Sequence, residues 1–363
     1  MKNIILQEDI EHIYNSLDQS EKSSFDKSEI LVTGCSGFLG YTIMHFYLHY
    51  ADQLGITRVI GVDNFKIQKP DWLDSLKHKF PKILEIHQCN VSTDNLRQIN
   101  GIEQVDFVVH MASIASPLFY RKYPLETVDA NVWGLRQLLD IFSKEKLRGF
   151  LFFSSSEIYG NPNDCNIPTQ EEFLGNVSCV GPRACYDEAK RFCETLCYIF
   201  SQQHEMPITI VRPFNNFGPG MNLGDARLPA DLANAILNNK NITMFSDGTP
   251  TRTFCYVADA VSGYLKSLCY GKFDYFNIGM DSPEISVQKL AEIYQEKGRD
   301  LFNYPGEIIF KGHEDKAYLT HNPSRRCPDI AKARKILNFK PTIDVLHGVE
   351  RYLRFLSIER NVL

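Results

Sequence analysis

The sequence has no cysteine pair at metal-ligand spacing, no long apolar run and no large excess of either charge. Its 10 cysteines are scattered, with no C-x-x-C pair and no Cys/His cluster, which argues against the common zinc sites and indicates reduced thiols. No apolar run reaches membrane-spanning length, and the first thirty or so residues lack the pattern of a signal peptide. The formal net charge of −5 gives no reason to expect nucleic acid or an anionic membrane as a partner. We therefore expect a cytoplasmic protein without a metal site.

The sequence does contain a regular alternation of short apolar segments and helical patterns. We predict strands at residues 30–33, 58–62, 84–88, 107–110, 150–154 and 208–212, and helices at residues 9–17, 41–50, 127–143 and 186–203. Strands that are apolar throughout and alternate with helices indicate a parallel sheet covered on both faces. The predicted fold class is therefore α/β, a Rossmann-type doubly wound sheet with a smaller C-terminal α/β lobe for the substrate.

The length of 363 residues is enough for such a lobe beside the sheet. Residues 29–214 are expected to form the domain that holds the Rossmann-type sheet, to which residues 255–280 return. Residues 215–254 and 281–345 are assigned to the substrate lobe. Residues 1–28 are expected as an N-terminal extension and residues 346–363 as a C-terminal helix.

A glycine-rich turn joins the first predicted strand to the helix that follows it. Gly34 permits a tight turn, Gly37 lets the backbone approach a pyrophosphate, and Gly40 allows helix and strand to pack closely. Asp63 ends the next strand, where a carboxylate accepts hydrogen bonds from ribose hydroxyls and repels a 2′-phosphate. The alternative is an ordinary glycine-rich turn beside a solvated aspartate. The spacing favours a dinucleotide site, and Asp63 favours NAD over NADP.

Tyr186 and Lys190 are four residues apart in a segment with helical periodicity. This spacing places a phenol and an ammonium on one face of a helix. A neighbouring cation favours the phenolate, which can accept a proton from a sugar hydroxyl. Taken alone, the spacing is common by chance on amphipathic helices, so it gains meaning only together with the dinucleotide site.

These two motifs together resemble the extended short-chain dehydrogenase/reductase family of nucleotide-sugar epimerases, dehydratases and decarboxylases. The resemblance runs from about residue 29 to about residue 354, through the strings GVDNF (61–65), VVHMASIASP (108–117), FFSSSEIYG (152–160), RPFNNFGPGM (212–221) and DGTPTRTFCYVADA (247–260). Within the family, the strings SPLFY (116–120), GNVSCVGPRACYDEAKRFCET (175–195) and RRCPDI (325–330) are most similar to the UDP-glucuronate decarboxylase branch.

The resemblance implies a role for each residue that matches a cofactor position. The pyrophosphate would be held by Gly34, Ser36, Gly37, Phe38, Leu39 and Gly40, and the adenosine by Asp63, Asn64, Asn90 and Val91. Relatives often have Asp where this chain has Asn90. The rest of NAD would lie against Met111, Ala112, Ser113, Tyr186, Lys190 and Pro213.

The resemblance also implies which residues carry the chemistry. Tyr186 would be the base at the sugar C4 hydroxyl, Lys190 would lower its pKa, and Ser155 would bond the same C4 oxygen. Glu157 is typical of dehydratases and the decarboxylase, whereas simple epimerases have a small or hydroxyl residue there. Ser156 stands where dTDP-glucose dehydratases carry an acid, which argues against that reaction.

A decarboxylase of this kind would oxidise C4 of UDP-glucuronate, lose CO2 from the β-keto acid and reduce the product to UDP-xylose. Arg183 is the candidate cation for the sugar carboxylate. The other substrate contacts implied are Ser116, Tyr120, Asn215, Arg227, Arg252 and Arg326.

Alternatives stay open at this point. Glu126 and Asp129 lie where decarboxylases tend to carry lysines, and Ile114 replaces a more usual proline. A 4-epimerase or 4,6-dehydratase acting on another nucleotide sugar is therefore the second candidate, and a non-catalytic NAD or nucleotide-sugar binding protein is the third. In the family, the helices around residues 131–139 and Tyr186 usually pair with their copies, so we expect a homodimer.

Overall fold

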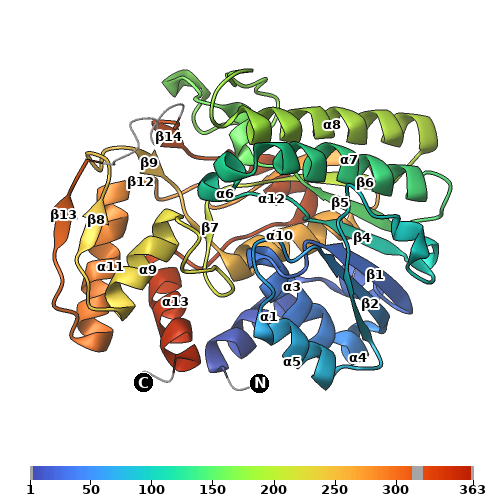
Figure 1. Cartoon of the computed structure of the whole chain (residues 1–363), viewed down its shortest axis with the longest axis horizontal. Helices are drawn as coiled ribbons and strands as arrows, with labels where there is room; N and C mark the ends of the chain where they lie inside the picture. Colours follow the sequence, from blue (N-terminus) through green and yellow to red (C-terminus); the bar gives the residue numbers. More distant parts are fainter. Residues whose placement is uncertain (1–2, 313–321, 361–363) are drawn as a thin grey trace.

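Seven parallel strands form the central sheet of the computed structural model, which describes residues 3–312 and 322–360 (Figure 1). The strand order is β11-β6-β5-β4-β1-β2-β3. The strands are β1 (Ser28–Thr33), β2 (Ile56–Asp63), β3 (Leu84–Gln88), β4 (Phe107–His110), β5 (Gly149–Phe153), β6 (Ile208–Pro213) and β11 (Asp274–Ile278). Each predicted strand is present, with its ends within two residues of the prediction. The predicted doubly wound α/β fold is confirmed.

Helices cover both faces of this sheet because its strands are apolar on both sides. One face carries α6 (Pro117–Lys122), α7 (Pro124–Phe142) and α8 (Ala184–His204), and the other carries α3 (Phe38–His49) and α10 (Val257–Cys269) (Figure 1). Successive residues of β1 alternate between the two cores: Ile30 and Val32 pack with α3 and α10, and Leu31 packs with α7 and α8. The short α4 (Ala51–Leu54) and α5 (Asp71–Lys79) flank β2 and β3.

The first helix is longer than the sequence predicted and is packed into the domain. Helix α1 (Ile4–Ser16) begins five residues before the predicted start, where the Asn3 side chain accepts a hydrogen bond from the Ile5 amide at 3.1 Å. Buried Asp9 accepts hydrogen bonds from Tyr256 Oη (2.8 Å) and Arg351 (2.7 Å). Residues 3–28, with α2 (Gln19–Ser23), are thus integrated into the fold; residues 1–2 of the expected extension lie outside the described residues.

The smaller lobe is built from short strands and three helices. It contains α9 (Leu228–Leu237), β8 (Ile242–Met244), α11 (Val287–Phe302), β13 (Ile308–Phe310) and α13 (Val345–Glu359), with β8 and β13 paired in parallel. The two-residue strands are β7 (Asn216–Phe217), β9 (Thr251–Arg252), β10 (Cys255–Tyr256), β12 (Ile285–Ser286) and β14 (Arg325–Arg326). Helix α12 (Ala331–Leu337), expected in the lobe, packs instead near β11, where Lys332 bonds Asp274 at 2.6 Å. Residues 313–321 of the expected lobe and 361–363 of the expected C-terminal helix lie outside the described residues.

None of the helices in residues 3–312 and 322–360 combines the length and apolar character needed to cross a membrane.

Candidate active site

A cavity of about 1320 Å³ lies where the carboxyl ends of the sheet strands face the smaller lobe. Strands β1, β2, β4, β5 and β6 end at this cavity, and the residues that follow them line it. Every residue that the sequence analysis assigned to cofactor, substrate or catalysis lines the cavity except Arg326, which is buried behind it. The structure therefore brings together predicted residues as far apart in the chain as Gly34 and Arg252.

The glycine-rich turn has the shape of a dinucleotide cradle. Gly34 has φ +72°, and a Cβ there would lie 2.7 Å from the Ala112 amide nitrogen. A Cβ on Gly40 would lie 2.3 Å from the Cys35 carbonyl oxygen, so only glycine allows α3 to pack this closely. A Cβ on Gly37 would meet no atom closer than the Gly34 oxygen at 3.4 Å, so the room at Gly37 faces the cavity. This turn leads into the N-terminus of α3, which favours an anion such as a pyrophosphate.

Asp63 is fixed at the end of β2 beside that turn. Its Oδ2 accepts a hydrogen bond from the Ser36 amide at 3.1 Å, and its Oδ1 accepts one from the Phe65 amide at 2.9 Å. Farther along the cavity, Asn90 Oδ1 accepts two bonds from Ser92, at 3.1 and 2.9 Å. The asparagine oxygen expected to bond an adenine amino group therefore already has partners within the chain.

The remaining cofactor positions lie between the glycine turn and Tyr186. Buried Ser113 Oγ has no hydrogen-bond partner among the described residues, so it presents an unpaired hydroxyl to the cavity. The cavity wall here also includes Asn64, Val91, Met111, Ala112 and Pro213. The cradle, the fixed carboxylate and the orphaned hydroxyl fit an extended dinucleotide.

Tyr186 and Lys190 lie on one face of α8, as the spacing predicts. Lys190 Nζ is 5.8 Å from the centre of the Tyr186 ring and donates a hydrogen bond to the Phe153 carbonyl at 2.6 Å. Burial lowers the pKa of Lys190 to about 8. Burial also raises the pKa of Tyr186 to about 12, although a hydrogen bond with Ser155 opposes this. In the protein alone the phenol is therefore protonated at neutral pH, and a further cation near it is needed to make it a base.

Glu157 is held between two arginines from distant elements. It lies in a 3-10 turn (Ser156–Tyr159) after β5, and its Oε2 accepts hydrogen bonds from Arg183 and from Arg326, the latter at 2.7 Å. Burial tends to raise the pKa of Glu157, but the charges of Arg326 and Arg183 outweigh it and hold the pKa below its ordinary value. Glu157 is therefore a fixed carboxylate anion at neutral pH.

Arg183 immediately precedes α8 and uses each of its nitrogens within the protein. Nε donates to Asp187 Oδ2 at 3.3 Å, one terminal nitrogen donates to Asn322 Oδ1 at 2.9 Å, and the other bonds Glu157. Sequence reasoning missed Asp187 and Asn322. The spacing Arg183-x-x-x-Asp187 is the signal that could have indicated the first, because such charges are neighbours on a helix.

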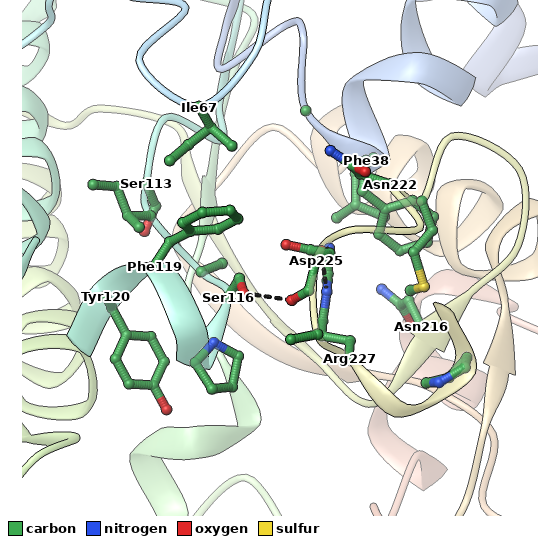
Figure 2. A pocket seen from close by; sticks show the side chains of 18 of the residues that line it. Phe38, Ile67, Ser113, Ser116, Phe119, Tyr120, Asn216, Asn222, Asp225 and Arg227 are labelled. Carbon is green, nitrogen blue, oxygen red and sulfur yellow. Dashed lines mark hydrogen bonds and ion pairs between the residues drawn. The ribbon is translucent and has the colours of Figure 1, made fainter. Parts of the chain in front are cut away.

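The remaining substrate positions surround the middle of the cavity (Figure 2). Ser116 Oγ donates a hydrogen bond to the Asp225 carbonyl at 2.7 Å, and Arg227, paired with the Asp225 carboxylate, lies 5.2 Å from the centre of the Phe38 ring. Tyr120 also lines the cavity, and Figure 2 shows its ring on the same side as Ser116, across from Asp225 and Arg227.

Two more of the predicted substrate residues are bonded to the loops that edge the lobe. Asn215 Nδ2 donates to the Thr253 carbonyl at 2.9 Å, and Arg252 donates to the Pro323 carbonyl at 2.6 Å. These contacts fix both side chains at the cavity wall.

The segment of residues 64–70 lines the cavity and contacts both α7 and the loop that contains Asn222. Lys66 Nζ lies 2.7 Å from Glu126 Oε1 at the start of α7, and Gln68 Oε1 accepts a hydrogen bond from Asn222 at 2.7 Å. Glu126, whose charge raised doubt about an acidic substrate, is thus paired with a lysine. Asp129 also lines the cavity.

The sequence of the chain is similar to that of known proteins over most of its length. The model of the NAD dependent epimerase/dehydratase family matches residues 30–279. UDP-glucuronic acid decarboxylase 3 of Arabidopsis thaliana is 35% identical over 336 residues, covering 92% of this chain and 91% of that protein. UDP-glucuronic acid decarboxylase 1 of Xenopus tropicalis is 30% identical over 370 residues, covering 98% of this chain and 79% of that protein.

Solved structures share the fold at lower identity. The UDP-glucose 4-epimerase of Thermotoga maritima, with UDP-glucose, has a TM-score of 0.79 at 22% identity and covers 92% of this chain and 100% of that chain. The UDP-glucuronic acid 4-epimerase of Bacillus cereus, in complex with UDP-glucuronic acid and NAD, has a TM-score of 0.73 at 23% identity and covers 92% and 99%.

Proposed function

The chain belongs to the NAD dependent epimerase/dehydratase family, and from that premise we propose that it converts UDP-glucuronate to UDP-xylose and CO2. NAD is the cofactor that this family uses. The observation that carries the proposal is the group of arginines around Glu157: Arg183 and Arg326 bond this carboxylate and Arg252 lies near it at the cavity wall, which suits a sugar acid. The relatives at 30–35% identity, named as UDP-glucuronic acid decarboxylases, support the same reaction.

The residues of the chain would prepare the first step. NAD supplies the acceptor, and later the donor, of the hydride exchanged at C4. Tyr186, Lys190 and Ser113 would hold the nicotinamide end of NAD, whose positive charge would favour loss of the proton from the Tyr186 phenol. Tyr186 would then accept the C4 hydroxyl proton, with Ser155 orienting the same oxygen and buried Lys190 holding the end of β5 through the Phe153 carbonyl.

Decarboxylation follows from the chemistry of the oxidised sugar. With a ketone at C4, the carboxylate on C5 belongs to a β-keto acid. When the bond from C5 to C6 breaks, its electrons form an enolate with the C4 oxygen and C6 leaves as CO2. A proton then adds to C5, and Tyr186 returns its proton to O4 when C4 is reduced. The sequence consumes one proton and leaves NAD unchanged.

A second candidate function is 4-epimerisation of a nucleotide sugar. The observation that favours it is Asp129, a carboxylate on the cavity wall where decarboxylases tend to carry lysine. The fold neighbours include epimerases, which is compatible with both reactions. A non-catalytic binding protein is less well supported, because such a protein has no need of Ser155, Tyr186 and Lys190 together.

The experiment that tests the proposal is incubation of the purified protein with NAD and UDP-glucuronate. We expect CO2 and UDP-xylose in equal amounts, measured by CO2 trapping and proton NMR. The Tyr186→Phe variant, which keeps the ring but lacks the ionisable hydroxyl, is the control and should produce neither. A UDP-galacturonate product without CO2 would replace the proposal with epimerisation.

We also infer a homodimer in the cytoplasm. Helices α7 and α8 pack on each other and expose large apolar side chains, among them Leu125, Trp133, Phe192 and Tyr198, which supports pairing with a second copy. All ten cysteines lie in the described residues and are free thiols, which supports a reducing compartment.

A further inference from the structure

We propose that Asp187 is a positioning residue that orients Arg183 against Glu157 and takes up a proton when the carboxylate of the substrate binds. The inference rests on the proposed function, because it concerns the part of the site that would receive the sugar acid. Asp187 would thus set the net charge of that part of the site without contacting the reacting atoms.

The position of Asp187 gives it direct control of Arg183. It follows Tyr186 on α8, and its side chain is 9% exposed. One carboxylate oxygen accepts the Nε–H of Arg183 at 3.3 Å, and the opposite end of that guanidinium bonds Glu157. The other oxygen, Oδ1, is buried and has no hydrogen-bond partner among the described residues. A buried carboxylate with one unpaired oxygen gains from protonation.

Charged and titratable groups surround Asp187 from each neighbouring element. Glu157 approaches from the turn after β5, Arg326 from β14, and Tyr120 from α6, while Arg183, Cys185 and Tyr186 belong to its own segment. Burial and the charge of Glu157 raise the pKa of Asp187 to about 7, and Arg183 opposes this. The carboxylate is therefore poised between its two forms near neutral pH.

The charges explain why the substrate would shift that balance. The guanidiniums of Arg183 and Arg326 face the carboxylates of Glu157 and Asp187, and that of Arg252 lies near Glu157 and Glu284. The sugar carboxylate lies two bonds from C4, so it would come close to this group when C4 is at Tyr186. A third carboxylate favours the neutral form of Asp187 by Coulomb repulsion. By linkage, protein with neutral Asp187 binds the anionic substrate more tightly than protein with ionised Asp187.

Calorimetry measures this coupling without turnover. NAD-loaded Tyr186→Phe enzyme is titrated at pH 7 with UDP-glucuronate, and with UDP-glucose as the neutral-sugar control, in buffers of different ionisation enthalpy. We expect UDP-glucuronate to take up a fraction of a proton more than UDP-glucose, because the buried Asp187 carboxylates that are still ionised at that pH become protonated. The extra uptake should vanish in Tyr186→Phe/Asp187→Asn and persist in Tyr186→Phe/Glu188→Gln, whose altered carboxylate is exposed on the same helix.

Steady-state kinetics supplies the second measurement. If binding selects the protonated form, KM for UDP-glucuronate should rise severalfold from pH 7 to pH 8 in the wild type, because the fraction of protein with Asp187 protonated falls over this range. Asp187→Asn should flatten this rise and lower kcat, since Arg183 loses a charged partner, and Asp187→Glu should restore the slope in part. Equal proton uptake in Asp187→Asn and its parent would overturn the inference. Absence of CO2 from the wild type would instead overturn the proposed function, so the two failures are distinguishable.

Discussion

The ring of Tyr120 lies parallel to the ring of Tyr186, with their centres 5.3 Å apart and their planes 13° apart. Tyr120 is buried, and its hydroxyl has no hydrogen-bond partner among the described residues. Helix α6 thus holds the phenol of Tyr186 in one plane and presents a second phenol beside it. Burial keeps the pKa of Tyr120 well above its ordinary value, so this second hydroxyl stays protonated and can only donate or accept a hydrogen bond.

The two functions of Tyr120 can be separated by substitution. Tyr120→Phe keeps the stacked ring and removes the hydroxyl, so we expect KM for the nucleotide sugar to rise about tenfold while kcat stays within about twofold of the wild type. Tyr120→Ala removes the ring as well and should lower kcat by at least about tenfold. Initial rates over a range of substrate concentrations distinguish these outcomes; an unchanged KM in Tyr120→Phe would show that the hydroxyl does not meet the substrate.

Lys190 is expected to increase the reaction rate and to decrease the stability of the folded protein. Its pKa is about 8 in the folded protein and about 10.4 in the unfolded chain, so the buried ammonium disfavours folding below pH 8, and this penalty fades as the pH rises toward 10. Lys190→Met should therefore increase the free energy of unfolding of the cofactor-free protein at pH 7, by up to about 3 kcal/mol, while kcat falls at least about 100-fold. Urea unfolding and initial rates measure both. A less stable Lys190→Met protein would contradict the burial argument.

Asp63 is expected to set the choice of cofactor. Asp63→Asn keeps an oxygen for the Ser36 or Phe65 amide but removes the charge that repels a 2′-phosphate, so the preference for NAD over NADP should fall by at least about tenfold. Calorimetric Kd values for the two cofactors measure this preference. Asp74→Asn, which loses an exposed carboxylate paired with Lys69, is the matched control and should leave it unchanged.

Lys66 is expected to mask the charge of Glu126. Glu126→Gln should change KM for UDP-glucuronate by less than about twofold, because the lysine already neutralises the carboxylate. Lys66→Met exposes the negative charge at the cavity wall and should raise KM severalfold, and the double variant should return close to the wild-type value. A large effect of Glu126→Gln alone would show that the carboxylate acts on the substrate directly.

The apolar face of α7 and α8 is expected to hold two copies together. Trp133 and Phe192 are 58% and 51% exposed, one on each helix. Trp133→Glu with Phe192→Glu places like charges on a self-complementary interface and should give monomers in sedimentation experiments. Phe310→Glu, which alters a 54% exposed ring on β13 in the smaller lobe, should leave the oligomeric state unchanged.

Most of the sheet could be predicted because strands such as β1, β4 and β5 are short apolar runs in the sequence. The start of α1 was missed because its boundary is set by the Asn3 side chain, which the sequence alone does not distinguish from a polar linker. The two-residue strands β7, β9, β10, β12 and β14 carry no periodicity of their own. Their pairing depends on partners tens of residues away, such as Arg252 with Arg326.

The candidate site likewise combines local motifs, which the sequence shows, with contacts between distant segments, which it does not. The glycine turn, Asp63 and the Tyr186–Lys190 pair are local motifs that the sequence shows, and the family resemblance implied that they belong to one site. The contact of Glu157 with Arg183 and Arg326 joins three segments, so the sequence could give only the residues and not the pairing. Lys190 was expected to lower the pKa of Tyr186, but burial of the phenol raises it. The spacing of the two residues gives no information about burial.

The bond between Asp9 and Arg351 has a consequence for how the chain is made. The two residues are 342 positions apart, so the first helix leaves the ribosome long before its partner on α13 is synthesised. Until then Asp9 has no guanidinium to offset its burial, and the apolar face of α1, including Ile10 and Ile13, lacks part of its cover. A nascent chain stalled before residue 345 should therefore leave α1 more accessible to proteases and chaperones than a chain in which α13 has been synthesised.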